Sequence, residues 1–292
     1  MQYPINEMFQ TLQGEGYYTG VPAIFIRLQG CPVGCSWCDT KHTWEKQADR
    51  ETSLGDILVK TVESDAWGNA DTATLLSSIA QQGWTARHVV ITGGEPAIYD
   101  LRPLTASLEA AGFQCQIETS GTYEIHCSEQ TWVTVSPKVN MRGGYDVLAQ
   151  ALSRADEIKH PVARQRDVEA LDDLLAGIQD SKARIIALQP ISRKDEATKL
   201  CIETCLKSLF DLRFGRAGVF ESLQLHVFTP FRQRFIDAKE RFQPLLFQLW
   251  QIGDRLNRII GRIDFAGRNR HDFVIHFATV DHFQYANRAQ FN

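Results

Sequence analysis

Several features that define large classes of proteins are scarce or missing in this sequence of 292 residues. No uninterrupted apolar run approaches the roughly 18 residues that a membrane span needs. The first residues have neither the basic segment nor the apolar segment of a secretory leader. The seven cysteines are odd in number and unevenly spread, unlike a disulfide framework. We therefore expect a cytoplasmic protein without membrane contact, in which a tight cysteine cluster would serve metal binding or catalysis.

Excess charge of one sign is also small, because the formal net charge is −4, and it indicates neither a nucleic acid nor another charged partner. This average conceals two segments of opposite sign. Residues 206–292 have a net charge of +5 and contain 13 of the 16 phenylalanines, whereas residues 1–205 have a net charge of −9. The abrupt change predicts a boundary near Cys205, between a domain of residues 1–205 and a C-terminal extension of residues 206–292.

Three of the cysteines lie close together in the stretch Gly30-Cys31-Pro32-Val33-Gly34-Cys35-Ser36-Trp37-Cys38-Asp39-Thr40. A structural zinc site and a cubane iron–sulfur cluster each normally take four protein ligands. A triad without a near fourth ligand therefore predicts an open coordination position, where the amino and carboxylate groups of a small molecule could bind. A zinc site completed by a distant fourth residue is the alternative.

Strand-like and helix-like patterns alternate along the first 205 residues. Such alternation favours a parallel sheet with helices outside it, and sites in such folds collect at the carboxyl ends of the strands. Glycine-rich or polar residues follow several predicted strands, at Gly93-Gly94-Glu95-Pro96, Thr119–Thr122, Ser136-Pro137-Lys138 and Gln189-Pro190. The predicted strands are 23–28, 87–92, 113–118, 132–135, 156–160 and 184–188, and the predicted helices are 72–82, 101–111, 145–155, 167–176 and 193–206.

Two features near the N-terminus have an ordinary and a functional interpretation. Gly14-Glu15-Gly16 permits either a simple turn or close approach of the backbone to a ligand. Arg27 is a charge in an apolar strand, so it either reaches solvent at the strand end or receives an anionic group in a pocket. Cysteines outside the triad, Cys115, Cys127, Cys201 and Cys205, are expected to be small buried hydrophobic residues.

The cysteine triad with Trp37 resembles the signature of the radical S-adenosylmethionine (SAM) superfamily, and Gly93-Gly94-Glu95-Pro96 is similar to its second motif. Four further stretches resemble the 7-carboxy-7-deazaguanine synthase family: Phe9-Gln10-Thr11-Leu12-Gln13-Gly14-Glu15-Gly16, Cys38-Asp39-Thr40, Glu118-Thr119-Ser120-Gly121 and Ser136-Pro137-Lys138. The resemblance covers about residues 1–205. It implies an α/β fold, a partial (open) TIM-like β/α barrel of about six parallel strands of the radical SAM type, with an appended C-terminal segment.

The resemblance also implies roles for individual residues. Cys31, Cys35 and Cys38 would bind a [4Fe-4S] cluster, with one iron left for the methionine end of SAM. SAM would also contact Trp37, Cys38, Asp39, Gly94, Ser136, Pro137 and Lys138. The substrate would be held by Leu12, Gln13, Gly14, Arg27 and Thr92, with Arg27 on its carboxylate. Thr40 would be a ligand of Mg²⁺, an ion that needs few protein ligands when water and substrate oxygens surround it.

The implied reaction contracts the ring of 6-carboxy-5,6,7,8-tetrahydropterin to give 7-carboxy-7-deazaguanine with loss of ammonia, in the queuosine pathway. A 5′-deoxyadenosyl radical would abstract the C6 hydrogen of the substrate, and the return of hydrogen would regenerate SAM as a true cofactor. No side chain is assigned to the proton movements. The resemblance further implies a homodimer and an external reductant such as flavodoxin.

Two alternatives to this interpretation stay open. Another radical SAM enzyme, such as a glycyl-radical activase, would share the triad but is not expected to have both Leu12-Gln13-Gly14 and Ser136-Pro137-Lys138. A non-enzymatic iron–sulfur or zinc module that regulates or binds a partner would need only the cysteines.

The resemblance fails in the C-terminal extension. Ser222–His226 is only weakly similar to the short strand that ends members of the family, and residues 243–261 have the apolar spacing of an amphipathic helix. The basic, phenylalanine-rich character would suit RNA binding, partner docking or contact with a membrane surface. We interpret residues 206–292 instead as a non-homologous or frame-shifted extension.

Overall fold

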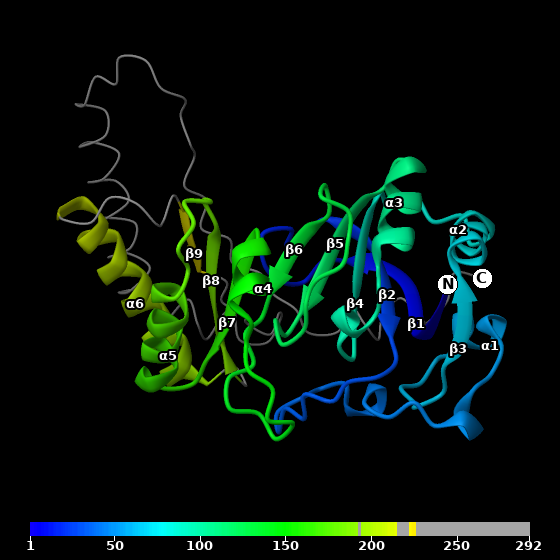
Figure 1. Cartoon of the computed structure of the whole chain (residues 1–292), viewed down its shortest axis with the longest axis horizontal. Helices are drawn as coiled ribbons and strands as arrows, with labels where there is room; N and C mark the ends of the chain where they lie inside the picture. Colours follow the sequence, from blue (N-terminus) through cyan, green and yellow to red (C-terminus); the bar gives the residue numbers. More distant parts are fainter. Residues whose placement is uncertain (192–193, 215–221, 226–292) are drawn as a thin grey trace, which may run out of the picture.

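The structure, a computed structural model, describes residues 1–191, 194–214 and 222–225. Its described strands form one sheet in the order β3-β1-β2-β4-β5-β6-β7-β8-β9 (Figure 1). They are β1 (Gln2–Leu12), β2 (Pro22–Leu28), β3 (Gly68–Asp71), β4 (His88–Gly93), β5 (Gln114–Thr119), β6 (Trp132–Val135), β7 (Glu157–Val162), β8 (Ile185–Pro190) and β9 (Ser222–Leu225).

Most neighbouring strands in this sheet are parallel. β2, β4, β5, β6, β7, β8 and β9 run in one direction, which confirms the six predicted strands. β1 pairs antiparallel with β2, and β3 pairs antiparallel with β1. The sequence did not predict β1 or β3, since β1 mixes polar and apolar residues and β3 is only Gly68–Asp71. The weak similarity at Ser222–His226 corresponds to β9, which pairs with β8.

The helices between the strands agree with the predicted ones to within a few residues, except that the last predicted helix continues to Phe214, eight residues beyond its predicted end, and that α1 and the short turns were missed. Asp71 accepts a hydrogen bond from the Thr74 backbone N–H at the start of α2, and Gly83, with φ of +65°, follows its end. The helices are α1 (Leu54–Leu58), α2 (Thr72–Gln81), α3 (Arg102–Ala110), α4 (Ala149–Arg154), α5 (Gln165–Ala176) and α6 (Asp195–Phe214), with 3-10 turns η1 (Lys41–Thr43), η2 (Ala48–Arg50) and η3 (Pro96–Ile98). The amphipathic helix predicted over 243–261 lies outside the described residues.

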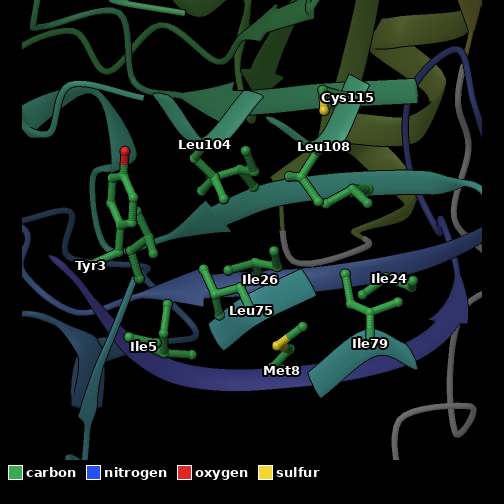
Figure 2. Packing of buried hydrophobic residues seen from close by; sticks show 14 of the residues in the cluster. Tyr3, Ile5, Met8, Ile24, Ile26, Leu75, Ile79, Leu104, Leu108 and Cys115 are labelled. Carbon is green, nitrogen blue, oxygen red and sulfur yellow. The ribbon is translucent and has the colours of Figure 1, made fainter. Parts of the chain in front are cut away.

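One face of the sheet is apolar and is covered by the helices. Ile24 and Ile26 of β2 pack in the same cluster as Leu75 of α2 and Leu104 and Leu108 of α3 (Figure 2). A second cluster joins Ile158 and Ile186 to α4, α5 and α6, and it contains Cys201 and Cys205. Burial of Cys115, Cys201 and Cys205 confirms their prediction as small core residues, and the half-buried Cys127 packs against both clusters.

The other face of the sheet carries polar side chains at alternate positions, because successive residues of a strand point to opposite faces. Cys115 and Ile117 of β5 belong to the apolar cluster, whereas Gln116 and Glu118 between and beside them form hydrogen bonds with each other and with Gln13. This polar inner face is the place where the fold can hold a polar ligand. In the part of the chain that the structure describes, no helix is both long and apolar enough to cross a membrane.

Candidate active site

The cysteine stretch follows β2 and folds back on η1. The backbone N–H of Gly30 donates to the Thr43 carbonyl at 2.7 Å, and that of Cys31 donates to the Trp44 carbonyl at 2.9 Å. Gly30 has φ of +105°, which favours glycine, and this lets the chain leave β2 sharply. Residues 31–38, which we call the cysteine loop, are therefore held by backbone bonds at the carboxyl end of β2.

The three thiols of this loop lie near one another. Burial, together with the nearby charges of Glu95, Cys35 and Cys38, raises the pKa of Cys31 to about 11. The indole Nε1–H of Trp44 donates to Cys38 Sγ at 3.4 Å. The pKa of Cys35 is raised by burial, which the positive charge of Lys138 partly opposes. An N–H donor and a nearby ammonium both favour thiolates, as iron–sulfur ligands must be.

The donor set suits a cluster better than a single ion. Within residues 1–191, 194–214 and 222–225, no three His, Cys, Asp or Glu side chains converge on one metal ion. A mononuclear zinc site needs its sulfur atoms to meet at one point, whereas a cubane takes each thiolate on a different iron. Three thiols on one loop, with an N–H donor at Cys38 and the Lys138 charge near Cys35, are the kind of ligands that such a cluster takes.

Two glycines bring the end of β4 against the cysteine loop. A Cβ added to Gly94 would lie 2.2 Å from the Gly30 carbonyl oxygen, and one added to Gly93, with φ of +127°, would lie 2.3 Å from the Leu28 nitrogen. The N–H of Gly94 donates to the Leu28 carbonyl at 2.9 Å, and that of Glu95 donates to the Gly30 carbonyl at 2.8 Å. The Gly93-Gly94 motif is thus used for close backbone approach at the site predicted from the sequence.

Glu95 joins two strand ends in a way that sequence reasoning missed. Its carboxylate is buried and accepts hydrogen bonds from the Ala97 N–H, the Thr119 hydroxyl and the Ser120 N–H. The resemblance to known motifs included Glu95 and Glu118-Thr119-Ser120-Gly121 as separate stretches. The structure connects the two stretches, because the Glu95 carboxylate accepts hydrogen bonds from Thr119 and Ser120 of the second stretch.

The connection from β6 to α4 reaches the cysteine loop from the other side (Figure 1). The N–H of Gly143 donates to the Val33 carbonyl at 3.0 Å, and Gly34 packs on Arg142. At the start of this connection, Lys138 Nζ donates to the Ser136 hydroxyl at 2.6 Å, and Pro137 is buried. The predicted SAM-contacting stretch Ser136-Pro137-Lys138 therefore lies beside the cysteine loop, with the Lys138 charge acting on Cys35.

Three predicted site residues, Trp37, Asp39 and Thr40, lie at or just beyond the end of the cysteine loop. The side chains of Trp37 and Asp39 are exposed, and the Thr40 hydroxyl lies 3.6 Å from Cys38 Sγ. All three belong to the rim of the cysteine loop. The predicted magnesium ligand Thr40 is thus close to the predicted cluster.

Arg27 and Thr92 are paired neighbours on β2 and β4. Arg27 does not reach solvent: its side chain is 11% exposed, and its Nε donates to Glu7 of β1 at 3.0 Å. The solvent interpretation of Arg27 is therefore wrong. A guanidinium has five N–H donors, so the bond to Glu7 leaves most of them for an anion.

Leu12, Gln13 and Gly14 form the turn that follows β1. The N–H of Gln13 donates to the Val21 carbonyl at 2.8 Å, and its carbonyl accepts from Gly20 at 2.7 Å, so its backbone is largely used within the turn. Leu12 is exposed and Gln13 is buried. The N–H of Gly14 donates to no group among the described residues, and it is the free donor of this turn.

Other polar residues of the inner face were missed by sequence reasoning. A signal was present, because the strand sequences Gln114-Cys115-Gln116-Ile117-Glu118 and Glu157-Ile158-Lys159 alternate polar and apolar residues. The sequence analysis predicted both only as strands and did not assign their polar side chains to one face. The alternation places Gln116, Glu118, Glu157 and Lys159 on the inner face, facing the β1–β2 turn.

Fold and site together define a class: a largely parallel, open β/α barrel with a Cys-x₃-Cys-x₂-Cys loop at its strand ends is the architecture of radical SAM proteins. No family model matches the chain. The chain is 74% identical over 206 residues to the 7-carboxy-7-deazaguanine synthase of Escherichia coli K12, covering 70% of this chain and 92% of that relative. The chain belongs to the 7-carboxy-7-deazaguanine synthase family.

More distant relatives and a solved structure agree with this assignment. The synthase of Buchnera aphidicola is 48% identical over 206 residues, with the same shares covered, and that of Flavobacterium psychrophilum is 33% identical over 201 residues, covering 68% of this chain and 82% of that relative. The crystal structure of QueE from Escherichia coli matches with a TM-score of 0.70 and 73% identity, over 71% of this chain and 91% of that one.

Proposed function

We propose that this chain converts 6-carboxy-5,6,7,8-tetrahydropterin to 7-carboxy-7-deazaguanine with loss of ammonia, as a carbon–nitrogen lyase of queuosine biosynthesis. The observation that carries this proposal is the 74% identity over 206 residues, which spans 92% of a relative with that name. The site supports the proposal, because three thiols and two adjacent glycines follow the carboxyl ends of neighbouring strands, and a largely buried arginine lies on one of these strands.

The cofactors in this proposal are a [4Fe-4S] cluster on Cys31, Cys35 and Cys38, SAM and Mg²⁺. When bound, the cluster and SAM supply a carbon-centred radical that removes hydrogen from a position that acids and bases do not activate. The chain binds and orients. Its contacts to SAM come from Trp37, Cys38 and Asp39 on the loop, Gly94 at the end of β4, and Ser136, Pro137 and Lys138 after β6.

The substrate in this proposal lies over the inner face between the β1–β2 turn and the β2–β4 pair. Leu12, Gln13 and Gly14 contact the pterin, and the free N–H of Gly14 is the donor that supports this role. Arg27 binds the substrate carboxylate through its terminal nitrogens while Glu7 keeps the Nε hydrogen bond. Thr92 adds a hydrogen bond beside Arg27, and Thr40 holds Mg²⁺.

The proposal includes a homodimer and an external reductant such as flavodoxin, and no direct contact with nucleic acid. It assigns catalysis to residues 1–205 and no role to residues 206–292. The division at Cys205 remains a prediction. α6 continues through that point to Phe214, and β9 joins the sheet, so the described elements extend to Leu225.

Anaerobic reconstitution tests the proposal. The purified chain is loaded with iron and sulfide, and its absorption spectrum is recorded before and after SAM is added. We expect a brown protein whose spectrum changes with SAM. Incubation with 6-carboxytetrahydropterin, SAM, Mg²⁺ and reductant should then release the deazaguanine and one equivalent of ammonia.

Two outcomes would contradict the proposal. A colourless protein with stoichiometric zinc would support the non-enzymatic module. Full cluster loading with SAM cleavage but no deazaguanine would support another radical SAM activity, such as a glycyl-radical activase.

A further inference from the structure

The β1–β2 connection, residues 13–21, crosses the inner face and is fixed at its far side. Glu15 accepts a hydrogen bond from Lys159 Nζ of β7 at 2.6 Å through one carboxylate oxygen, and from Gln189 Nε2 of β8 at 2.9 Å through the other. β1 is the second strand of the sheet, whereas β7 and β8 are the seventh and eighth. We call residues 13–21 the strap, because it connects the two sides of the open barrel.

Lys159 connects to the substrate turn by two routes. The first is the direct ion pair with Glu15. The second runs through Glu118, which lies 3.6 Å from Lys159 Nζ and whose Oε1 accepts from Gln13 Nε2 at 2.9 Å. Both routes end within the turn of Leu12, Gln13 and Gly14.

The charges around Lys159 make this arrangement sensitive to loss of the cation. Its side chain is 6% exposed and forms ion pairs with Glu15 and Glu118, and the charge of Glu157 also acts on it. Burial would lower the pKa of Lys159, but the charges of Glu118 and Glu15 outweigh burial and raise it. Conversely, burial opposes ionisation of Glu15, yet the Lys159 charge brings the Glu15 pKa below its usual range. Without the ammonium, Glu15 and Glu118 would repel each other across the position that Lys159 now occupies.

A second anchor supports the same part of the strap. The fully buried carboxyl of Glu157 accepts from the Tyr17 N–H at 3.0 Å and from the Thr134 hydroxyl at 2.9 Å. A Cβ on Gly16, which has φ of +72°, would lie 2.7 Å from both Glu157 oxygens. Glycine suits this position because it adopts a positive φ without strain and has no Cβ to meet the Glu157 carboxylate, so the strap is also held to β7 here.

We propose that Lys159 is a positioning residue for the substrate: through Glu15 and Glu118 it holds the strap so that the turn at Leu12-Gln13-Gly14 presents its backbone to the pterin. This inference rests on the proposed function, which assigns that turn to the pterin. Lys159 itself lies on β7, and we assign it no contact with SAM or with the cluster.

The test compares Lys159→Met, Glu15→Gln and the double variant Glu15→Gln/Lys159→Met with the unchanged chain. Each is loaded anaerobically, and KM for the pterin, KM for SAM, kcat and bound iron are measured. Amide hydrogen exchange of a peptide covering residues 13–21 gives a readout independent of turnover.

Lys159→Met should raise KM for the pterin by about tenfold or more, because a displacement of ~1 Å in a binding group is this costly. KM for SAM and the iron content should stay within about twofold, and exchange in residues 13–21 should increase. Glu15→Gln should raise KM for the pterin by a smaller factor, since Lys159 keeps its ion pair with Glu118. KM of the double variant for the pterin should be close to that of Glu15→Gln and below the value obtained by multiplying the two single effects. The reason is that the double variant removes the repulsion between the carboxylates of Glu15 and Glu118.

Two further variants serve as controls. Lys159→Arg keeps the charge and should retain most of the pterin affinity. Asp180→Asn weakens another ion pair between a buried cation and a partly exposed carboxylate, with Arg184 at 2.6 Å before β8, and should lower the melting temperature without changing either KM. If Lys159→Met does not fold, Glu15→Gln and Lys159→Arg carry the test, since Glu15 is 37% exposed and the change is nearly isosteric.

The inference is overturned if Lys159→Met or Glu15→Gln lowers the melting temperature as Asp180→Asn does while KM for the pterin and exchange in residues 13–21 stay unchanged. It is also overturned if both KM values rise together. Failure of the unchanged chain to bind or convert the pterin would instead reject the proposed function, so the two failures are distinct.

Discussion

At the scale of single residues, the seven cysteines have two kinds of surroundings. Cys31, Cys35 and Cys38 share a loop with a cation and an indole N–H nearby, whereas Cys201 is fully buried in the apolar cluster under α6. Burial alone raises the pKa of Cys201 to about 12, so its thiol stays protonated. The three cysteines of the proposed cluster site and the core cysteines therefore differ in their neighbours.

This difference predicts opposite results for two alanine variants. Cys35→Ala removes one thiolate of the proposed cluster site and should abolish iron binding and turnover. Cys201→Ala should keep both and lose about 1 kcal/mol of stability from the small cavity. Iron content, product formation and urea unfolding measure these effects. Retained activity in Cys35→Ala would reject the assignment of the site.

Arg27 and Glu7 allow stability to be separated from substrate binding. Arg27→Leu leaves the Glu7 carboxylate, 10% exposed, without its cation, so both stability and pterin affinity should fall. The double variant Glu7→Gln/Arg27→Leu should recover much of the stability, but its KM for the pterin should stay raised by about 100-fold, the value of a charge-assisted pair. Recovery of both would show that Arg27 only stabilises the sheet.

The surroundings of the His160 side chain predict how the free energy of unfolding depends on pH. Its Nε2 must donate to the Asp167 carbonyl, and its buried Nδ1 has no partner, so a second proton would have no acceptor. Burial accordingly lowers the pKa of His160 from 6.5 to about 4. The unfolded chain therefore binds a proton below pH 6.5 that the folded chain does not bind until about pH 4. Stability should be complete above pH 6.5 and decrease toward pH 4, by roughly 3 kcal/mol from this residue.

The measurement is urea unfolding between pH 4.5 and 7.5, with His160→Gln as the comparison. Glutamine keeps an amide donor for Asp167 and does not titrate, so its stability curve should be flatter over this range. Parallel curves for the two proteins would contradict the assignment.

At the scale of elements, the site depends on how closely strand ends approach one another. Gly94 carries β4 to within contact of the cysteine loop, and Glu95 then holds the end of β5. The contact is between backbone atoms, which cannot move aside as a side chain would. A substitution that displaces one of these three segments, the cysteine loop or the ends of β4 and β5, should therefore displace the other two.

Gly94→Ala tests this unit. The added Cβ meets the Gly30 carbonyl at 2.2 Å, so the cysteine loop must shift, and we expect loss of SAM affinity by about tenfold or more together with lower iron content. Gly83→Ala is the matched control. Its φ of +65° strains alanine by about 1 kcal/mol, but nothing lies within 4 Å of the new Cβ, so SAM binding should be unchanged. Normal SAM binding in Gly94→Ala would contradict the role of this contact.

At the scale of the whole molecule, every described element ends by Leu225, and the similarity to the Escherichia coli synthase covers 206 residues. A chain ended after residue 230 keeps all of these elements. We expect it to bind iron and SAM and to form product at a rate within about twofold of the full chain, since β9 still covers the edge of β8. Loss of activity on truncation would assign a role to residues 231–292.

Much of the fold could be predicted from the sequence because its signals are local. Apolar runs such as residues 23–28 and 87–92 indicate buried strands, and helical spacing with a terminal glycine indicates α2. β1 escaped prediction because Asn6 and Glu7 break its apolar pattern. Both are buried beside partners distant in the sequence, Gln29 and Arg27, which no local pattern reveals.

The sequence by itself determined the chemistry of the site, because thiol spacing, adjacent glycines and the polar residues after strands are properties of short stretches. Only the tertiary structure decided which side chains act together. Arg27 is neutralised by Glu7 across a strand pair, and Lys159 reaches Glu15 over 144 positions of the chain. Contacts over such separations depend on the folded arrangement of the strands and of the strap, and the same charged residues in an unfolded chain would remain solvated and apart.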